Sequence, residues 1–378
     1  MSSLLEHPEE NENSVIPKYQ MLAERLRQRI ETCELQPGDR LPTFAEMRSE
    51  YNVTSSTVER MYGVLEQEGL IERQPRRGLF VAEPQRVLTG NIGIRGNMDL
   101  GVQPEFFYSR LNHGLQEAAD HHGRRLLWQK DPFTKDNIKN VDGLLLSGHP
   151  AGSNNKIVRM KPAHMPAVSM FILAEGLNSV VVDDYGAAKI ATRHLLELGH
   201  RRIACFMNNI IHTPQIPRNR IAGYQDALQE AGVVFDPRWL RQVHYPEIPR
   251  PESVTPHQSW LQWSHEQMQI WLKEGWRDLH CTAILAQNDH IAIGIMQVLQ
   301  EANINVPGEV SVIGFDGTEL CDYSTPRLSS VKLPLEQIGT RAVGLLVEQI
   351  ENGQPEEQII VLPAKLRAGA STAPCSVS

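Results

Sequence analysis

The sequence predicts an α/β protein in which a small helix-turn-helix unit with a two-stranded wing precedes a larger domain of parallel sheets. Between residues 41 and 81, capped helical patterns are followed by two short apolar strands around a basic turn. From residue 91 onward, short apolar runs alternate with amphipathic helical segments, which is the rhythm of βαβ units. At 378 residues the chain is long enough for two or three domains.

Composition divides the chain into four segments. Residues 1–15 carry four glutamates and no lysine or arginine, which predicts a disordered acidic tail. Residues 16–83 form the expected helix-turn-helix domain, and its first helix is expected to begin near Pro17. Residues 84–90 have little apolar content and read as a linker. Residues 91–372 form the predicted larger domain.

The helix-turn-helix is predicted from its caps and from one apolar stripe. Thr43 followed by Glu46 is a capping box, and Thr54 can cap the next helix by accepting from the N–H near Thr57. Apolar residues then recur at spacings of three and four, which predicts a buried face. These residues are Val58, Met61, Tyr62 and Leu65.

A hairpin with a basic tip follows the second of these helices. We expect strands over residues 70–73 and 79–81, and a helix-turn-helix with such a hairpin is built to place one helix in a major groove. Residues 16–83 carry ten Lys/Arg against eleven Asp/Glu, so phosphate contacts must come from a local cluster such as Arg73, Arg76 and Arg77. The candidate DNA contacts are Thr43, Thr54, Ser55, Ser56, Thr57, Glu59, Arg60, Arg76, Arg77 and Gly78.

This segment resembles the winged-helix DNA-binding domain of the GntR family of bacterial transcription regulators. Members of that family commonly have arginine where this chain has Ala45, Ser55 and Glu59. A glutamate at the third position can accept from cytosine N4 but repels phosphate, so we expect an unusual operator and an affinity that depends on the wing. The resemblance is carried by Pro37-Gly38-Asp39-Arg40-Leu41-Pro42, Thr57-Val58, Glu66-Gln67-Glu68-Gly69-Leu70-Ile71 and Gly78-Leu79-Phe80-Val81.

Beyond residue 91, strands and helices are expected to alternate. Two of the helices are expected to stop at Gly199 and Gly232, and residues 245–265 read as a longer irregular insertion. The expected strands cover residues 92–94, 126–127, 143–146, 180–182, 203–206, 283–286 and 310–314.

This larger part resembles the sugar-responsive core of the LacI/GalR family, which has the two-lobed fold of type I periplasmic binding proteins. The resemblance implies a first lobe from residues 90–184 and 308–353 and a second from 185–307 and 354–372. The arabinose-repressor subgroup combines a GntR-type DNA-binding domain with a LacI-type effector domain in this way. The matching phrases include Val141-Asp142-Gly143-Leu144, Val182-Asp183-Asp184-Tyr185-Gly186, Leu198-Gly199-His200-Arg201-Arg202-Ile203, Arg220-Ile221-Ala222-Gly223-Tyr224, Asn288-Asp289 and Gly314-Phe315-Asp316.

Ligands of open α/β sheets bind beyond the carboxyl ends of the strands, where four side chains are suitable. Phe107 and Tyr108 offer flat surfaces for stacking, Arg220 can grip two oxygens, and Asp289 can accept hydroxyl protons. These residues align with the effector contacts that the resemblance implies, and Tyr245 and Asp316 are weaker candidates.

Structural roles remain open for several of these residues. Asp289 could be only a helix N-cap, and Phe107 could be plain core. Arg220 is expected in the first turn of a helix, where its positive charge would oppose the helix dipole. This unfavourable interaction argues against a purely structural role. Tryptophans at helical spacing are more often packing than sugar platforms. A metal at His113, His121 and His122 is disfavoured because no Cys, Asp or Glu completes a ligand set.

The sequence also bounds the class of function. No apolar run reaches the length of a membrane span, and five scattered cysteines without a CxxC suit a reducing cytosol. The glycines at 90, 93 and 96 do not make a dinucleotide fingerprint, and no cofactor is expected. We therefore expect a cytoplasmic repressor that binds double-stranded operator DNA as a homodimer and responds to a sugar. One alternative is an aminotransferase-like enzyme, but we find neither the Schiff-base lysine nor the phosphate-binding loop that such an enzyme needs. The other is a binding module whose helix-turn-helix domain has lost specific DNA affinity.

Overall fold

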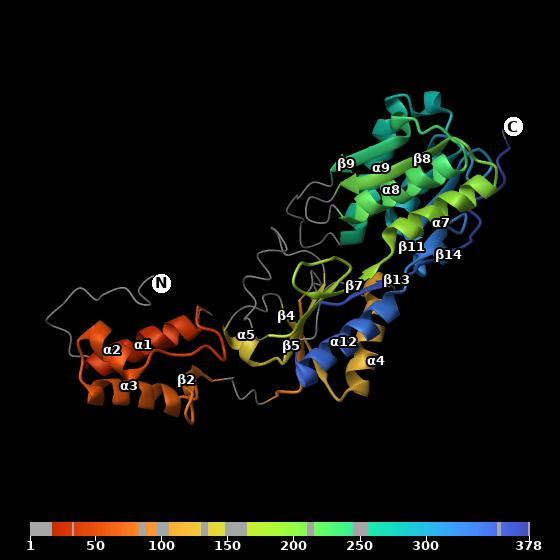
Figure 1. Cartoon of the computed structure of the whole chain (residues 1–378). Helices are drawn as coiled ribbons and strands as arrows, with labels where there is room; N and C mark the ends of the chain where they lie inside the picture. Colours follow the sequence, from red (N-terminus) through yellow and green to blue (C-terminus); the bar gives the residue numbers. More distant parts are fainter. Residues whose placement is uncertain are drawn as a thin grey trace. The chain divides into compact units, whose positions relative to one another are not determined.

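The computed structural model describes residues 17–31, 34–82, 88–95, 106–129, 135–147, 165–209, 215–244, 256–353 and 357–376. The chain divides into two compact units that meet in sequence between Leu88 and Thr89 (Figure 1). The first unit is helical with one hairpin, and the second holds two six-stranded sheets. None of the described helices combines the length and the apolar character needed to cross a bilayer.

The first unit is a winged helix-turn-helix, as predicted. It consists of α1 (Lys18–Glu31), α2 (Phe44–Tyr51), α3 (Ser55–Gln67), β1 (Ile71–Gln74) and β2 (Gly78–Val81). The Thr43 side chain accepts from the Glu46 N–H, and the Glu46 carboxylate accepts from the Thr43 N–H at 2.6 Å, so the predicted capping box is confirmed. Thr54 likewise accepts from the Thr57 N–H and caps α3.

The predicted apolar stripe of α3 forms the centre of this unit's core. Val58, Met61, Tyr62 and Leu65 are all buried, and they pack with residues of α1 such as Leu26. The Tyr62 hydroxyl donates to the Pro42 carbonyl at 2.6 Å, so the buried polar end of this ring is satisfied. Full burial of such side chains stabilises the fold by roughly 1.5–3 kcal/mol each, which holds the opposite face of α3 toward solvent.

The wing is an antiparallel pair in which the first strand lies one residue later than expected and the second begins one residue earlier. Ile71 pairs with Val81 and Gln74 pairs with Gly78, so β1 begins after Leu70 and β2 begins at Gly78. The turn between them needs left-handed backbone at Arg76 (φ 65°) and at Gly78 (φ 122°). Because glycine adopts this conformation without strain, the hairpin closes at Gly78.

The first lobe of the second unit is built on a parallel sheet with strand order β13-β7-β6-β5-β3-β4. Its strands are β3 (Asn91–Arg95), β4 (Arg125–Gln129), β5 (Gly143–Ser147), β6 (Ala167–Met170), β7 (Asn178–Val182) and β13 (Ile359–Leu362). Its helices are α4 (Phe106–His121), α5 (Lys135–Lys139) and α12 (Leu335–Asn352). The helices α4 and α12 approach so closely that a Cβ on Gly114 would lie 2.1 Å from the Glu336 carbonyl oxygen.

The second lobe is built on the sheet β14-β12-β11-β10-β8-β9, parallel except for β14, which runs antiparallel to β12. Its strands are β8 (Ile203–Asn209), β9 (Leu240–His244), β10 (Ala283–Ala286), β11 (Ser311–Asp316), β12 (Ser329–Lys332) and β14 (Lys365–Arg367). Its helices are α7 (Asp184–Glu197), α8 (Gln215–Glu230), α9 (Pro256–Lys273), α10 (Asp289–Glu301) and α11 (Leu320–Tyr323), with 3₁₀ turns at Pro237–Trp239 and Trp276–Leu279. The helices α7 and α8 lie side by side (Figure 1).

Two expectations about the second unit were wrong. Residues 308–333 were expected in the first lobe, yet β11 and β12 belong to the second sheet, while β13, expected in the second lobe, joins the first. The insertion expected over residues 245–265 is helical from Pro256, and residues 245–255 lie outside the described part of the chain. Trp263 and Trp271 of that helix are buried against Phe206, so they are packing residues.

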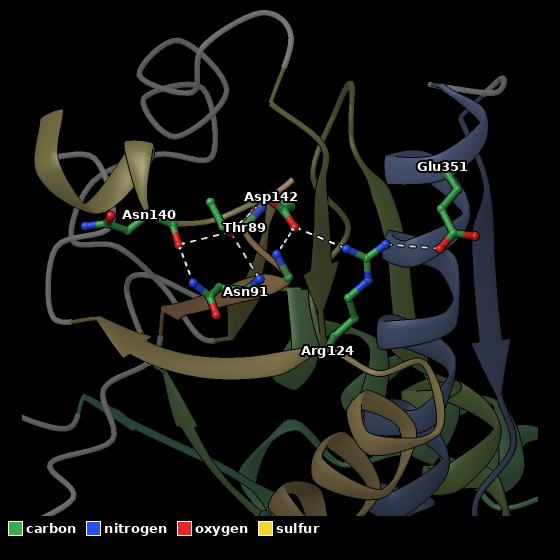
Figure 2. A network of polar contacts seen from close by, with 7 residues as sticks. Thr89, Asn91, Arg124, Asn140, Asp142 and Glu351 are labelled. Atoms are coloured by element: carbon green, nitrogen blue, oxygen red, sulfur yellow. Dashed lines mark hydrogen bonds and ion pairs between the residues drawn. The ribbon is translucent and has the colours of Figure 1, made fainter. Parts of the chain in front are cut away.

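The chain enters the second unit through a polar network around Asp142, which stands just before β5 (Figure 2). The Asp142 side chain is 1% exposed and accepts from the backbone N–H groups of Thr89 at 2.7 Å and Gly90 at 2.8 Å. Arg124 donates to the same carboxylate at 3.2 Å and to Glu351 of α12 at 3.1 Å. This network ties the start of β3 to the amino ends of its neighbours.

Candidate DNA-binding face and effector site

The face of α3 opposite the buried stripe carries the predicted recognition residues. Ser55, Ser56, Glu59 and Arg60 are all exposed. The Thr54 hydroxyl lies 2.9 Å from the hydroxyls of both Ser56 and Thr57, so these groups also form part of the cap. The helix therefore presents short hydroxyl groups at its start and the Glu59 carboxylate further along.

That carboxylate has a partner on the wing. The Arg73 guanidinium lies 3.5 Å from the Glu59 carboxylate and 3.7 Å from that of Glu66, and it also lies 5.8 Å from the ring centre of Phe44. Because these charges are solvent-exposed, the ion pairs contribute at most about 1 kcal/mol. Arg73 was expected to add to the wing's positive charge, but its charge is locally balanced by the two glutamates.

The tip of the wing keeps its positive charge and gains a residue that was not predicted. Arg76 and Arg77 are exposed, and the Arg77 guanidinium lies 5.4 Å from the ring centre of Phe80. Arg40 forms a backbone bridge to Phe80, and its Nε would lie 3.5 Å from a Cβ on Gly78. The sequence indicated Arg40 only through the family-like segment Gly38-Asp39-Arg40. Its neighbour in space, Phe80, lies 40 residues away in the chain.

In the second lobe, Arg220 is buried at the carboxyl ends of the strands. Its Nε donates to the Asp184 carboxylate at 2.7 Å, and its Nη1 donates to the Gln287 carbonyl oxygen, just after β10. The guanidinium carbon lies 4.2 Å from the ring centre of Phe315. Because α8 begins at Gln215, Arg220 occupies the second turn of its helix and not the first, which corrects the dipole argument.

Asp184 is the ionic partner that the sequence did not single out. It lies 36 residues before Arg220 and is 5% exposed, so burial raises the pKa of its carboxyl while the guanidinium of Arg220 lowers it. The neighbouring Asp183 has a different role, because its side chain caps α7 by accepting from the Gly186 N–H at 2.8 Å. The segment Val182-Asp183-Asp184-Tyr185-Gly186 indicated a functional carboxylate, but the sequence did not show which of the two aspartates it is.

Asp289 is completely buried and is not the cap of α10. Asn288 takes that role by accepting from the Ile291 N–H at 2.8 Å, so the N-cap alternative for Asp289 was wrong. Burial raises the pKa of Asp289 to about 6, although the hydrogen bonds that its carboxylate accepts oppose this rise. The carboxylate accepts from Ser330 Oγ at 2.5 Å, the Thr318 N–H at 3.0 Å, Thr318 Oγ1 at 3.2 Å and Cys321 Sγ at 3.3 Å.

Asp316 stands at the carboxyl end of β11, in left-handed backbone with φ 100°. Burial raises the pKa of its carboxyl well above the usual value, the carboxylate of Asp289 raises it further, and Arg220 lowers it. The structure thus brings Arg220, Asp289 and Asp316 together within electrostatic range, as a site at this edge of the sheet requires. Of the nearby carboxyl groups, Asp184 and Asp316 are both within electrostatic range of the Arg220 guanidinium.

The remaining predicted effector residues lie elsewhere. Phe107 and Tyr108 stand in the first turn of α4 in the first lobe, half-buried, with their ring centres 5.2 Å apart. Phe107 also packs on Phe171 at 5.6 Å, and both rings touch the hydrophobic core, so the core alternative for Phe107 describes part of its role. Tyr245 lies outside the described residues. Within the described chain, no group of three or more His, Cys, Asp or Glu is arranged to hold a metal.

Comparison with known proteins is consistent with both units. Residues 18–81 match the family model for bacterial regulatory proteins of the gntR family, and residues 192–372 match the periplasmic binding protein-like domain. The HTH-type transcriptional regulator DegA of Bacillus subtilis is 27% identical over 354 residues, covering 88% of this chain and 98% of that protein. The arabinose metabolism transcriptional repressor of Geobacillus stearothermophilus is 24% identical over 358 residues, covering 89% of this chain and 92% of that protein.

Among solved structures, the transcriptional regulator CelR–cellobiose complex matches with a TM-score of 0.61 and 20% identity. The match covers 94% of this chain and 100% of that one, and at this identity it shows the fold alone. Because the related proteins are transcription regulators, the aminotransferase-like alternative falls away. The chain is a transcription regulator that joins a helix-turn-helix domain of the gntR family to an effector domain of the periplasmic-binding-protein-like type.

Proposed function

We propose that this regulator is a cytoplasmic repressor that binds operator DNA as a homodimer and changes its DNA affinity when a neutral sugar binds to the second unit. The observation that carries the proposal is the buried chain Asp184–Arg220–Gln287 at the carboxyl ends of β8 and β10. A buried ion pair contributes little net stability compared with apolar residues of the same volume. Its place at the ligand-binding edge of an open sheet therefore supports a binding role.

The chemistry of the site favours hydroxyl groups over anions. Arg220 has five N–H donors, two of which donate to Asp184 and Gln287, so its fork keeps donors for ligand oxygens. Asp316 adds carboxyl oxygens that can accept hydroxyl protons, whereas Asp289 already accepts from Ser330, Thr318 and Cys321 and would support the site from beneath. With more carboxylates than cations at this edge, an anionic ligand such as a uronate is disfavoured relative to a neutral sugar.

The first lobe would supply the apolar side of the site. Phe107 and Tyr108 offer ring faces on which a sugar can stack, and we propose that Tyr245, which follows β9 in the sequence, also contacts the sugar. Binding to both lobes would close them, and coupling of this kind is typically worth ~1–3 kcal/mol. The name of the arabinose repressor and the cellobiose in the CelR complex support sugars as the ligand class.

On the DNA side, we propose that the cap hydroxyls, Ser55, Arg60 and the wing arginines contact phosphates while Glu59 reads a base. The alternative is a helix-turn-helix domain with weakened specific affinity for DNA. One observation favours it, because Arg73 is paired with Glu59 and Glu66 and leaves only the wing tip strongly basic. A gel shift on the chain's own upstream DNA separates the two, since the alternative predicts no sequence preference over competitor DNA.

The effector is tested by thermal shift with arabinose, ribose, cellobiose, glucuronate and adenosine. A ligand that binds only the folded state stabilises it by about 2.7 kcal/mol at a hundred times its Kd, so the melting temperature must rise. The gel shift repeated with that ligand should show altered DNA affinity. No response to any of these ligands, or a response to glucuronate alone, contradicts the proposal.

Arg220→Lys is the sharpest variant for the site. Lysine keeps a charge for Asp184, but it lacks the planar fork that also reaches Gln287 and stacks on Phe315. We expect sugar affinity to fall roughly ten- to a hundredfold while DNA binding without sugar stays unchanged. Arg193→Lys, an exposed arginine of α7 paired with Glu230, is the matched control and should behave like the parent.

A further inference from the structure

Asn208 stands near the carboxyl end of β8 with an amide group that is sealed from solvent and unpaired. The residue is 0% exposed, and neither its Oδ1 nor its Nδ2 has a hydrogen-bond partner among the described residues. Other side chains of the described chain leave one buried polar atom unpaired, but Asn208 leaves both a donor and an acceptor. Burying such a group without partners is costly, so Asn208 requires a partner beyond the described residues, and a bound ligand can supply both a donor and an acceptor.

The position of Asn208 links it to the proposed effector site. Its backbone N–H donates to the side-chain Oε1 of Gln287, and the backbone carbonyl of Gln287 accepts from Arg220. One residue therefore joins Asn208 to the guanidinium. Side chains alternate along a strand, so Asn208 lies on the same face as Phe206, which packs against Trp263 of α9. Arg220 reaches the strand ends from α8, whereas Asn208 is part of the strand β8 itself.

The chemistry of an amide differs from that of its charged neighbours. The Arg220 guanidinium only donates hydrogen bonds, and the ionised carboxylates of Asp184 and Asp289 only accept them. An asparagine side chain does both, and it does not titrate. Two hydroxyls on adjacent carbon atoms match it, because one can donate to Oδ1 while the other accepts from Nδ2.

We propose that Asn208 is a specificity-determining contact of the effector, and that it reads a pair of neighbouring hydroxyls on a sugar. This inference rests on the proposed function, because it places the residue at the same site. It extends that function by separating sugars that carry the matching hydroxyl pair from epimers and deoxy sugars that lack it. A site that pairs buried groups with a substrate hydroxyl rejects the analogue lacking that hydroxyl strongly.

The test compares Asn208→Leu with the parent, because leucine has a similar volume and no polar atoms. We expect the ligand-free melting temperature to stay the same or to rise, since the unpaired amide is gone. Affinity for the sugar that stabilises the parent most, measured by calorimetry well below the melting transition, should fall roughly ten- to a hundredfold. The ratio of affinities for that sugar and its deoxy analogue should shrink toward one.

Asn112→Leu is the matched control, since Asn112 of α4 also has a buried, unpaired side-chain oxygen. It should bind the sugar like the parent. If Asn208→Leu does not fold, Asn208→Ser, which leaves room and a small hydroxyl, takes its place with the same expected loss. Parent-like affinity and discrimination in the Asn208 variant would overturn the inference and leave the proposed function standing. If no sugar stabilises the parent, the proposed function fails and the role of Asn208 fails with it.

Discussion

Asp142 holds Thr89 by two hydrogen bonds, one from the backbone N–H at 2.7 Å and one from the hydroxyl at 2.9 Å (Figure 2). Thr89 is the first residue of the second unit, so this carboxylate secures the chain where it arrives from the first unit. Arg124 connects the same carboxylate to Glu351 of α12. The network therefore connects Thr89 to the amino edge of the first lobe's sheet.

Asp142→Ala should destabilise the second unit. The substitution leaves two backbone N–H groups and the Arg124 guanidinium without this buried acceptor, and breaking a buried pair typically costs ~3–5 kcal/mol. All six tryptophans lie at residue 128 or beyond, so tryptophan fluorescence during urea unfolding reports this unit. Glu351→Ala is the control, and because Glu351 is exposed its cost should stay below about 1 kcal/mol. Equal effects of the two variants would show that Asp142 has no anchoring role.

Arg76→Ala combined with Arg77→Ala should weaken DNA binding to all sequences and flatten its salt dependence. Each phosphate contact contributes roughly 0.9 to the slope of log affinity against log salt, so we expect the slope to fall by about 1–2. Filter binding at several salt concentrations measures it. Arg73→Ala is the matched control, because the charge of Arg73 is already balanced by Glu59 and Glu66 and its removal should change the slope less. An unchanged slope in the double variant rules out the wing as the phosphate contact.

Glu59→Gln should change base preference more than affinity. The Glu59 carboxylate faces outward on α3 and can accept a hydrogen bond from cytosine, whereas an amide can also donate to other bases. Selection from randomised DNA should then show relaxed preference at one base pair, at about 1–3 kcal/mol of lost discrimination. If both proteins select the same site, Glu59 serves only as the partner of Arg73.

Asp289→Asn should remove a pH-dependent loss of stability. The pKa of Asp289 is raised to about 6 in the folded protein, against roughly 4 in an unfolded chain. The folded state therefore binds this proton more tightly, so the contribution of Asp289 to stability is greatest below pH 4 and is lost as the pH rises through 6. Relative to the parent, the asparagine variant should gain ~2–3 kcal/mol between pH 4 and pH 7.

The gain is read from urea unfolding at several pH values. Hydrogen bonds lost with the carboxylate add an offset that does not depend on pH. Removing the charge also lowers the pKa of Asp316, which acts in the same direction. A difference in unfolding free energy between variant and parent that stays constant from pH 4 to pH 7 would contradict this assignment.

The sequence by itself determined the elements whose ends depend on near neighbours. The box of Thr43 and Glu46 and the cap of Thr54 involve residues three apart, so their geometry is contained in the local chain. The buried stripe of α3 follows from helical periodicity alone, and the alternation of strands and helices predicted the class of the second unit. Local pattern was also enough to place Arg220 and Asp289 near the ends of parallel strands.

Only the tertiary structure decided which strands share a sheet and which polar groups meet. β11 and β13 are short apolar runs of the same character, and nothing in either run says which sheet it joins. The choice between Asn288 and Asp289 as the cap depended on the path of the chain out of β10, since both residue types cap helices well. The partners of Arg220 are distant from it in sequence. The same is true of Glu351, which binds the Arg124 guanidinium in the network around Asp142. Such pairs form because burial demands a partner for every charge, and that demand exists only after the chain has packed.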